Sequence, residues 1–181
     1  MASKGTKIAL WVVGILLVLA IIIAVVLWKV GLFATPEVSL QERGPYNYVY
    51  VERTGPFQDI PKGYQQVDSL VKQQNIDVGI RCGAYLDDPT KVAQNNLRWR
   101  VGNIVQDSME VTEPLMCLTI EQHQYLVASI HANPMIAPFK TYPAIEKWLS
   151  ENPYEAVGPA YELYQDDGLI EVLFPVDPKS N

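Results

Sequence analysis

An unbroken apolar run near the N-terminus is the strongest hydrophobic pattern in this chain. Residues 8–28 contain no charged side chain and consist almost entirely of Ile, Leu, Val, Ala and Trp. A helix of that length, at a rise of about 1.5 Å per residue, covers about 30 Å, the hydrocarbon thickness of a bilayer. Trp11 and Trp28 lie near its two ends, where indole rings favour the membrane interface. The run predicts one transmembrane helix at residues 8–28.

A cleaved signal peptide is the alternative interpretation of this run. The apolar core of a signal peptide is usually about 7–15 residues long and ends at small residues. Here the apolar stretch continues to Phe33, with Lys29 as its only charge, which favours a retained anchor. Lys4, Lys7 and the terminal amine precede the helix, so the positive-inside tendency predicts a cytoplasmic segment at residues 1–7. We expect a single-pass membrane protein whose C-terminal domain lies outside the cytoplasm.

Beyond residue 28 the pattern changes to short segments with the periods of strands and helices. Residues 29–43 are expected to form a tether, with a first strand in the polar stretch 34–45 as the alternative. The first round of elements is expected as a strand at 46–53, a helix at 60–74 and strands at 78–86 and 97–105. The second round is expected as strands at 116–121 and 124–130, a helix opened by Thr141-Tyr142-Pro143, and strands at 157–165 and 169–176.

The two rounds are copies of one another. Gly79, Tyr85, Asp87 and Asp88 recur as Gly158, Tyr164, Asp166 and Asp167, each 79 positions later. We therefore predict an α+β domain at residues 44–181, built from tandem strand–helix–strand–strand repeats at 44–105 and 115–176. Their strands would form one antiparallel sheet with both helices on one face, leaving the other face to solvent or a ligand. The groove between the halves is the default ligand site.

One carboxylate distinguishes the second copy from the first. Glu162 occupies the position that Gly83 holds in the first copy. Strand alternation puts Glu162 and Tyr164 on one face, and the repeat carries Tyr85 to the same face of the other half. An unpaired carboxylate in a helix-packed core would cost several kcal/mol, so we expect Glu162 to point to the open face. We predict a pocket with Glu162 as its polar group; a solvated glutamate on an exposed strand is the alternative.

Aromatic residues extend this hypothesis to a pocket wall. Tyr46, Tyr48 and Tyr50 share one strand face, where they would line the pocket or, alternatively, pack under the tether. Trp99 alternates with two arginines and should face the core or the cleft. Tyrosine rings around one carboxylate suit aromatic or cationic organic ligands, because ring faces attract cations. The predicted ligand-binding residues are Glu162, Tyr164, Tyr85, Tyr48, Tyr50 and Trp99.

Charge and cysteine content exclude other functions. The formal net charge is −6, but the first 33 residues hold three Lys and no acid, so the remainder has a net charge of −9. Such a surface repels nucleic-acid phosphates, and we expect no nucleic-acid partner. Cys82 and Cys117 could pair or stay buried and free. Neither has a second Cys or a His at metal-ligand spacing, so we expect no metal and no cofactor. The Asp-Asp pairs are interpreted as turn formers.

Several segments in this order resemble the GyrI-like (gyrase-inhibitor-like) small-molecule-binding family. They are ERTGPF, GAYLDDP, LRWRVG, TYPAIEKWL, AYELYQDD and IEVLFPV, and they span about residues 44–176. The family's tandem strand–helix–strand–strand architecture agrees with the repeat described above. The resemblance implies an acidic residue among aromatic side chains on the AYELY strand, which supports Glu162 with Tyr164 and Tyr85. An anchor helix before such a domain is also similar to the layout of a membrane-bound ER-phagy receptor of animals, whose role we do not carry over.

The resemblance implies three alternative functions. The first is a membrane-anchored domain that binds small organic molecules, cationic or aromatic, in the groove between its repeats. The second is a hydrolase of reactive small molecules, because some relatives use an acid and aromatic groups including Trp; Glu162 with Trp99 or Trp148 would then serve. The third is a protein-interaction scaffold with a filled groove. A membrane helix stands where the family's regulators carry a DNA-binding domain, which argues against direct transcriptional control.

Overall fold

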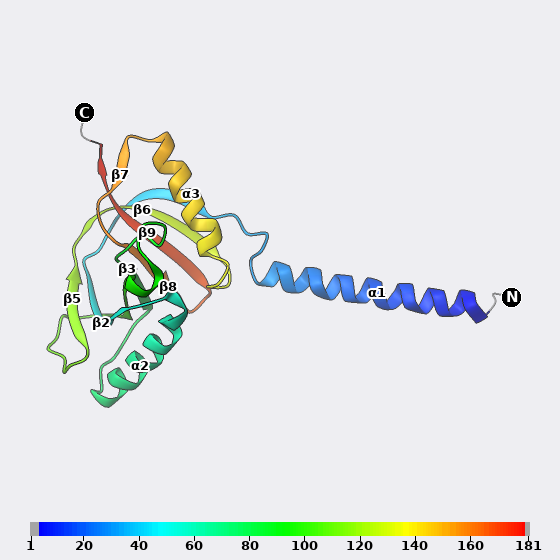
Figure 1. Cartoon of the computed structure of the whole chain (residues 1–181), viewed down its shortest axis with the longest axis horizontal. Helices are drawn as coiled ribbons and strands as arrows, with labels where there is room; N and C mark the ends of the chain where they lie inside the picture. Colours follow the sequence, from blue (N-terminus) through cyan, green and yellow to red (C-terminus); the bar gives the residue numbers. More distant parts are fainter. Residues whose placement is uncertain (1–3, 180–181) are drawn as a thin grey trace.

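Helix α1 (Lys4–Lys29) projects away from the rest of the chain as a single long rod (Figure 1). The computed structural model describes residues 4–179; the first residues of the predicted cytoplasmic segment, 1–3, lie outside the described part. Trp11–Lys29 is long and apolar enough to cross a membrane, and none of it is buried against the protein. The predicted helix at residues 8–28 is thus present.

Within residues 4–179, nine strands form an antiparallel sheet that combines both repeats. The strands are β1 (Glu37–Arg43), β2 (Tyr46–Thr54), β3 (Arg81–Tyr85), β4 (Arg98–Val105), β5 (Met116–Ile120), β6 (His123–His131), β7 (Tyr154–Ala156), β8 (Ala160–Tyr164) and β9 (Leu169–Pro178). Their order is β1-β6-β9-β8-β3-β4-β2-β5, and β7 pairs with β9 outside this path. The predicted fold class, α+β with an antiparallel sheet, is confirmed. The two repeats meet at the central pair, β3 and β8.

Helices α2 (Ile60–Gln73) and α3 (Pro138–Glu151) cover the same face of the sheet, each over its own repeat. Val67 and Val71 of α2 pack on the valines of β2 and β4, among them Val101. Ile145 of α3 packs against Val172 of β9 and apolar residues of β6. These contacts bury the apolar stripe of each amphipathic helix, and the central strands β3 and β8 lie between the strands that the two helices cover.

The opposite face of the sheet is closed rather than open, which corrects our expectation. Tyr48, Cys82, Val127 and Leu163, from four different strands, are all 2% exposed or less in one cluster. The cause is the curvature of the sheet. Two residues join β1 to β2 and reach at most about 11 Å, whereas the six inter-strand steps between those strands would cover about 29 Å in a flat sheet. The sheet must therefore curl until this face packs on itself.

The expected tether at residues 29–43 is partly a strand. Glu37–Arg43 forms β1, which pairs with β6 of the second repeat, from Glu37 opposite Ser129 to Arg43 opposite His123. β5 does the same in reverse by pairing with β2 of the first repeat. Each repeat thus begins with an additional strand that it lends to the other repeat. This exchange satisfies backbone groups of β2 and β6 that would otherwise lie at a sheet edge.

Helix α3 begins earlier than expected. Thr141 is not an N-cap; it is buried inside the helix, where its hydroxyl donates to the Ala137 carbonyl at 2.9 Å. The first helical residue is Pro138, whose missing N–H is not needed in the first turn. A second proline, Pro143, lies within the helix. We were right to expect a proline in the first turn of this helix, but that proline is Pro138 and not Pro143.

The cysteines and the aspartate pairs have structural roles. Both cysteines are free: Cys82 is buried on the closed face, and Cys117 packs on the helix-covered face, so no disulfide joins them. Asp88 accepts a hydrogen bond from the Thr90 amide at 2.8 Å, and Asp167 accepts one from the Leu169 amide at 2.9 Å. These contacts confirm the interpretation of the Asp-Asp pairs as turn formers.

Candidate functional site

The register between β3 and β8 relates the two repeats by a local twofold. Gly83 lies directly opposite Glu162, and these are equivalent positions of the two copies. Tyr85 and Tyr164 are also equivalent, and each lies two residues from the central pair on its own strand. Their hydroxyl oxygens are 3.5 Å apart. A symmetric pair of tyrosines therefore flanks a single carboxylate at the junction of the repeats.

Glu162 faces the helices, not the face opposite them as we expected. Its side chain meets Tyr142 of α3 on the helix-covered face, and the residue is 3% exposed. The Tyr142 hydroxyl donates to Oε1 at 2.9 Å, the Tyr85 hydroxyl donates to Oε2 at 3.3 Å, and the Tyr164 hydroxyl also donates to Oε2. A buried carboxylate is tolerated here because three donors replace the hydrogen bonds it would make with water.

The burial of this cluster changes its acid–base chemistry. Burial raises the pKa of Glu162 above the usual glutamate value, and the hydroxyls of Tyr164, Tyr142 and Tyr85 oppose that rise by bonding the charged form. Burial also raises the pKa of each of these tyrosines, and the adjacent carboxylate raises it further. The tyrosines therefore remain hydrogen-bond donors at neutral pH, and Glu162 is the group in the cluster whose charge can change.

Tyr64 of α2 completes the cluster without taking part in its hydrogen bonds. Its ring meets the Tyr164 ring edge-on at 6.3 Å, and its buried hydroxyl has no partner. That hydroxyl lies 3.3 Å from the place where a Cβ on Gly83 would stand. The Arg81 guanidinium lies over the same ring, 5.2 Å from its centre. The cluster thus contains one unused hydroxyl beside the small space left by Gly83.

The structure brings some of the predicted site residues together and separates others. Glu162, Tyr164 and Tyr85 meet as described. Tyr48 and Tyr50 lie on the closed face, opposite Glu162, because Tyr50 is in register with Gly102 and Cys82, whose side chains alternate away from the helices. They stack on one another at 5.0 Å, and they do not wall the same pocket.

Trp99 lies beside Tyr85 on the helix-covered face. The two residues are in register, and Trp99 is 2% exposed. Its indole N–H donates to the Gly55 carbonyl at 3.0 Å, and its ring packs against Gly63 of α2. Trp99 therefore supports the wall beside Tyr85, with its polar atom already engaged.

Sequence reasoning missed Tyr142 and Tyr64. Both tyrosines were visible within expected helices, but helical periodicity does not say which strand a helix residue will meet. The edge contact of Tyr142 with Phe174, 5.6 Å between ring centres, and the Tyr64–Tyr164 contact depend on how the helices dock. A tyrosine on the inward stripe of each helix was the available signal.

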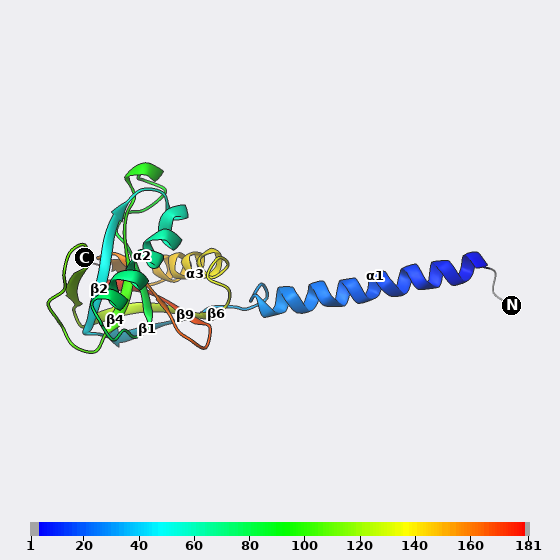
Figure 2. The same cartoon turned by 90° about the horizontal axis from the view of Figure 1, so that it is seen from below.

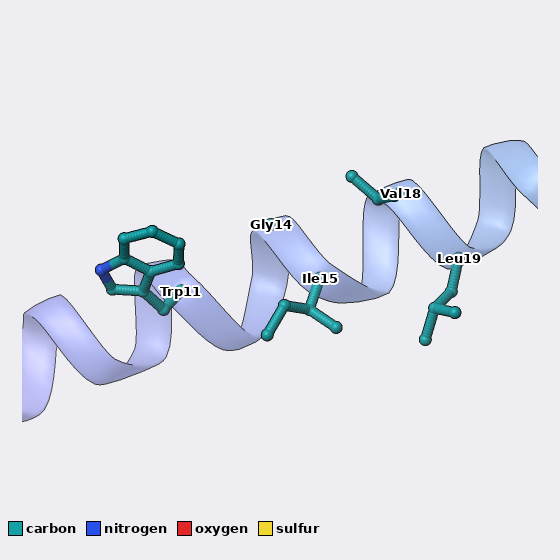
Figure 3. A pocket seen from close by; sticks show the side chains of 5 residues that line it. All are labelled: Trp11, Gly14, Ile15, Val18 and Leu19. Carbon is teal, nitrogen blue, oxygen red and sulfur yellow. The ribbon is translucent and has the colours of Figure 1, made fainter.

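Two surface hollows lie away from this cluster. One is a furrow along α1 formed by Trp11, Gly14 and neighbours on the same side of that single helix (Figure 3). It has one helix as its only wall, and a lipid chain would fill it if α1 crosses a membrane. The other lies at the ends of β3 and β4, between Asp77 and Met109. Within residues 4–179 no group of three or more His, Cys, Asp or Glu side chains is placed to hold a metal ion.

One model of a known protein family matches most of this chain. The model of the GyrI-like small molecule binding domain matches residues 36–177. The chain belongs to the GyrI-like family. The match begins at residue 36, so it includes β1, and the GyrI-like domain therefore starts with the exchanged strand that we had assigned to the tether. A comparison with curated protein sequences found no match.

Solved structures share the fold of this GyrI-like domain at low sequence identity. The C-terminal domain of EcmrR is 16% identical with a TM-score of 0.66, over 79% of this chain and 98% of that one. SAV2435 bound to tetraphenylphosphonium is 17% identical with a TM-score of 0.56, over 78% and 94%. A hydrolase from Listeria innocua is 11% identical with a TM-score of 0.53, over 79% and 93%. At these identities the likeness establishes the fold alone.

Proposed function

We propose that this protein is a membrane-anchored receptor domain for small organic cations with an aromatic or apolar body. The observation that carries the proposal is the buried carboxylate of Glu162, which accepts hydrogen bonds from three tyrosines on the helix-covered face of the sheet. A carboxylate at this place can neutralise one positive charge, and tyrosine ring faces add cation–π attraction. A ligand without charge would gain less from the site, because it would leave Glu162 buried without a counter-ion.

Binding requires the cluster to rearrange. Glu162 is 3% exposed and accepts three tyrosine hydroxyls, so a ligand reaches it when α2 and α3 move apart and one or more hydroxyls rotate away. Tyr64 lies ready to donate to the ligand, because its hydroxyl has no partner to lose. While the site is empty, the tyrosine hydroxyls take the place of a ligand and stabilise the buried carboxylate by hydrogen bonds.

The bound molecule of a structural neighbour agrees in chemical class. SAV2435 has been solved bound to tetraphenylphosphonium, a cation whose charge is enclosed by four phenyl rings. A site with one carboxylate and aromatic walls fits a molecule of this kind. Tetraphenylphosphonium is therefore the first probe to use with this protein.

A hydrolase is the second candidate. The raised pKa of Glu162 favours it, since a general acid or base works best when its pKa lies near the working pH. The fold likeness to a hydrolase from Listeria innocua is compatible with it. In this function Glu162 would take a proton from a water molecule whose oxygen attacks a ring carbon of an epoxide. The ring C–O bond breaks, and the ring oxygen takes a proton from a tyrosine hydroxyl of the cluster, which then recovers a proton from Glu162. That water would have to replace a tyrosine at the carboxylate, which makes hydrolysis dependent on the same opening as binding.

Membrane anchoring is part of the proposal. α1 supplies the bilayer-crossing segment, with residues 1–7 in the cytoplasm and the GyrI-like domain outside it. The test is alkaline phosphatase fused to the C-terminus, which is active when the domain lies outside the cytoplasm. Inactive phosphatase together with an active cytoplasmic reporter at the same place would show the reverse orientation.

Calorimetric titration of the full chain in nanodiscs with tetraphenylphosphonium tests the binding function, with empty nanodiscs as the blank. We expect saturable binding that weakens at least about tenfold, or about 1.4 kcal/mol, in Glu162→Gln. Glu146→Gln, which removes the same charge from the exposed side of α3, should bind like the parent chain. Hydrolysis of an epoxide that disappears in Glu162→Gln would favour the hydrolase. Neither binding nor turnover would leave the third alternative, a scaffold with a filled groove.

A further inference from the structure

Exposed apolar side chains gather where α1 joins the GyrI-like domain. Phe139 in the first turn of α3 is 83% exposed, Met135 in the β6–α3 loop is 81% exposed, and Phe33 just after α1 is 66% exposed. We call these three residues the joint surface. They come from two segments distant in sequence, the end of α1 and the stretch that leads into α3, which meet at the end of the domain from which α1 projects (Figures 1 and 2). No function described so far accounts for their exposure.

The joint between α1 and the domain is held by direct contacts. The Asn133 amide donates to the Val30 carbonyl at 2.9 Å, and the Lys140 ammonium donates to the Ala34 carbonyl at 2.8 Å. Gly31 has a positive φ of 79°, and a Cβ at this position would stand 2.6 Å from Ala132 Cα. This close approach of two backbone segments restricts the movement of α1 relative to the domain. The joint surface therefore has a defined position relative to the end of α1.

We propose that the joint surface inserts into the interfacial layer of the same bilayer that α1 crosses. The inference rests on the proposed membrane anchoring and adds a second membrane contact, made by the folded domain. The membrane-crossing segment ends at Lys29, and the β6–α3 loop is hydrogen-bonded to the next residue, Val30. Met135 thus lies two residues from an amide that contacts the end of the crossing segment. Aromatic and apolar side chains at this level favour the boundary between headgroups and acyl chains.

The charges around the joint indicate which lipid property matters. Lys29 and Lys140 lie at this end of the domain. So does the Asp166-Asp167 turn, because the first residue of β9, Leu169, pairs with His131 at the end of β6. Positive and negative side chains are therefore mixed around the joint surface. Insertion should depend on its apolar side chains and proceed on uncharged phosphatidylcholine, without a need for anionic lipid.

This docking would also orient the ligand site. Tyr142, which donates to Glu162, lies three residues after Phe139 on α3, so about one helical turn separates the carboxylate cluster from the membrane contact. A lipophilic cation collects in the interfacial layer, and the cleft between α2 and α3 would open close to that layer. The ligand would then enter from the membrane side.

Depth-dependent fluorescence quenching tests the proposal on the full chain. Single cysteines replace Met135, Phe139, Leu19 and Val157 in a Cys117→Ser background, and each carries an environment-sensitive dye; Cys82 is buried and stays. The proteins are placed in phosphatidylcholine nanodiscs with or without bromine on the acyl chains. Leu19 reports on α1 itself, and Val157, an exposed apolar residue beside β7, is the control remote from the joint. We expect a loss of emission in brominated lipid at positions 135, 139 and 19, and none at 157.

The probes separate the two claims. Quenching at position 19 without quenching at 135 and 139 would overturn the membrane contact of the domain while leaving the anchor in place. Absence of quenching at position 19 would overturn the anchor and, with it, the docking proposal. Probes at 135 and 139 that are shielded from water but unaffected by bromine would mean that another protein or a second copy covers the joint surface, which also contradicts the proposal. Equal quenching at 157 would show lipid contact without a preferred orientation and would overturn the proposed docking.

Discussion

Gly83 and Glu162 face each other in register across the junction of β3 and β8, at equivalent positions of the two repeats. The duplication would place two carboxylates here if both copies carried Glu. Two buried like charges in one site cannot both ionise without a large cost. With Gly in one copy, the second carboxylate has space, and tyrosines from both halves can converge on it.

Gly83→Glu should therefore destabilise the domain severely at neutral pH. The new carboxyl would be buried beside Glu162, whose three tyrosine donors are already engaged, and we expect a loss of about 3–5 kcal/mol in the free energy of unfolding. Gly83→Ala is the matched control, since its Cβ would meet the Tyr64 and Tyr85 hydroxyl oxygens at 3.3 and 3.4 Å and needs a shift of tenths of an ångström. Urea unfolding of both variants measures the difference. Equal stability of the two would contradict the arrangement described at the junction.

The hydroxyls of Tyr142 and Tyr64 should behave in opposite ways. Tyr142→Phe removes a 2.9 Å donor to a buried carboxylate and should cost about 1.5–3 kcal/mol of stability. Tyr64→Phe removes a hydroxyl that has no partner and should leave stability unchanged or slightly higher. Denaturant unfolding at neutral pH gives both values. In tetraphenylphosphonium titrations Tyr64→Phe should bind like the parent chain, because this cation has no atom that accepts a hydrogen bond from the Tyr64 hydroxyl.

Glu162 should make the domain less stable as pH rises. Its pKa is raised in the folded state, so the native protein holds a proton that the unfolded chain has lost once the pH exceeds about 4.3. Stability therefore falls from that pH upward and levels off above the folded-state pKa, with a loss of about 1.4 kcal/mol for each pH unit between the unfolded and folded pKa values. Melting temperatures of the parent chain, Glu162→Gln and Glu146→Gln between pH 4.5 and about 8 test this. Only Glu162→Gln should lose this part of the fall in melting temperature with pH. The same fall in all three proteins would contradict the assignment to Glu162.

Gly31→Ala should loosen the joint between α1 and the domain. The added Cβ would stand 2.6 Å from two atoms of Ala132, and the positive φ is itself unfavourable for Ala. Since residue 31 precedes the family-matched region, the melting temperature of the domain should stay the same while the lipid quenching of a probe at position 139 decreases. Gly14→Ala, whose Cβ meets nothing within 4 Å, is the control. Unchanged quenching in Gly31→Ala would show that the joint does not set the orientation of the domain.

The local sequence determined several features by itself. An apolar run without charge can form only a helix with an apolar surface on every side, and α1 is that helix. The period-two pattern of AYELY determined that Glu162 and Tyr164 share a face, and the 79-residue repeat determined that Tyr85 joins them. These relationships survive because each depends on spacing along one strand or on a copy of it.

Tertiary structure alone decided which face Glu162 would occupy. Alternation says which residues lie together, but both faces of β8 carry apolar or aromatic side chains, and neither face can be called open until the whole sheet is built. The two-residue link between β1 and β2 forces the sheet to curl until one face packs on itself. Glu162 lies on the other face, which the helices cover. Tyr142 reaches the carboxylate, and Tyr64 reaches the Tyr164 ring, only because α2 and α3 dock on the same face of the sheet. The joint surface likewise exists only where the end of α1 meets the stretch of residues 135–139, and no local pattern encodes that meeting.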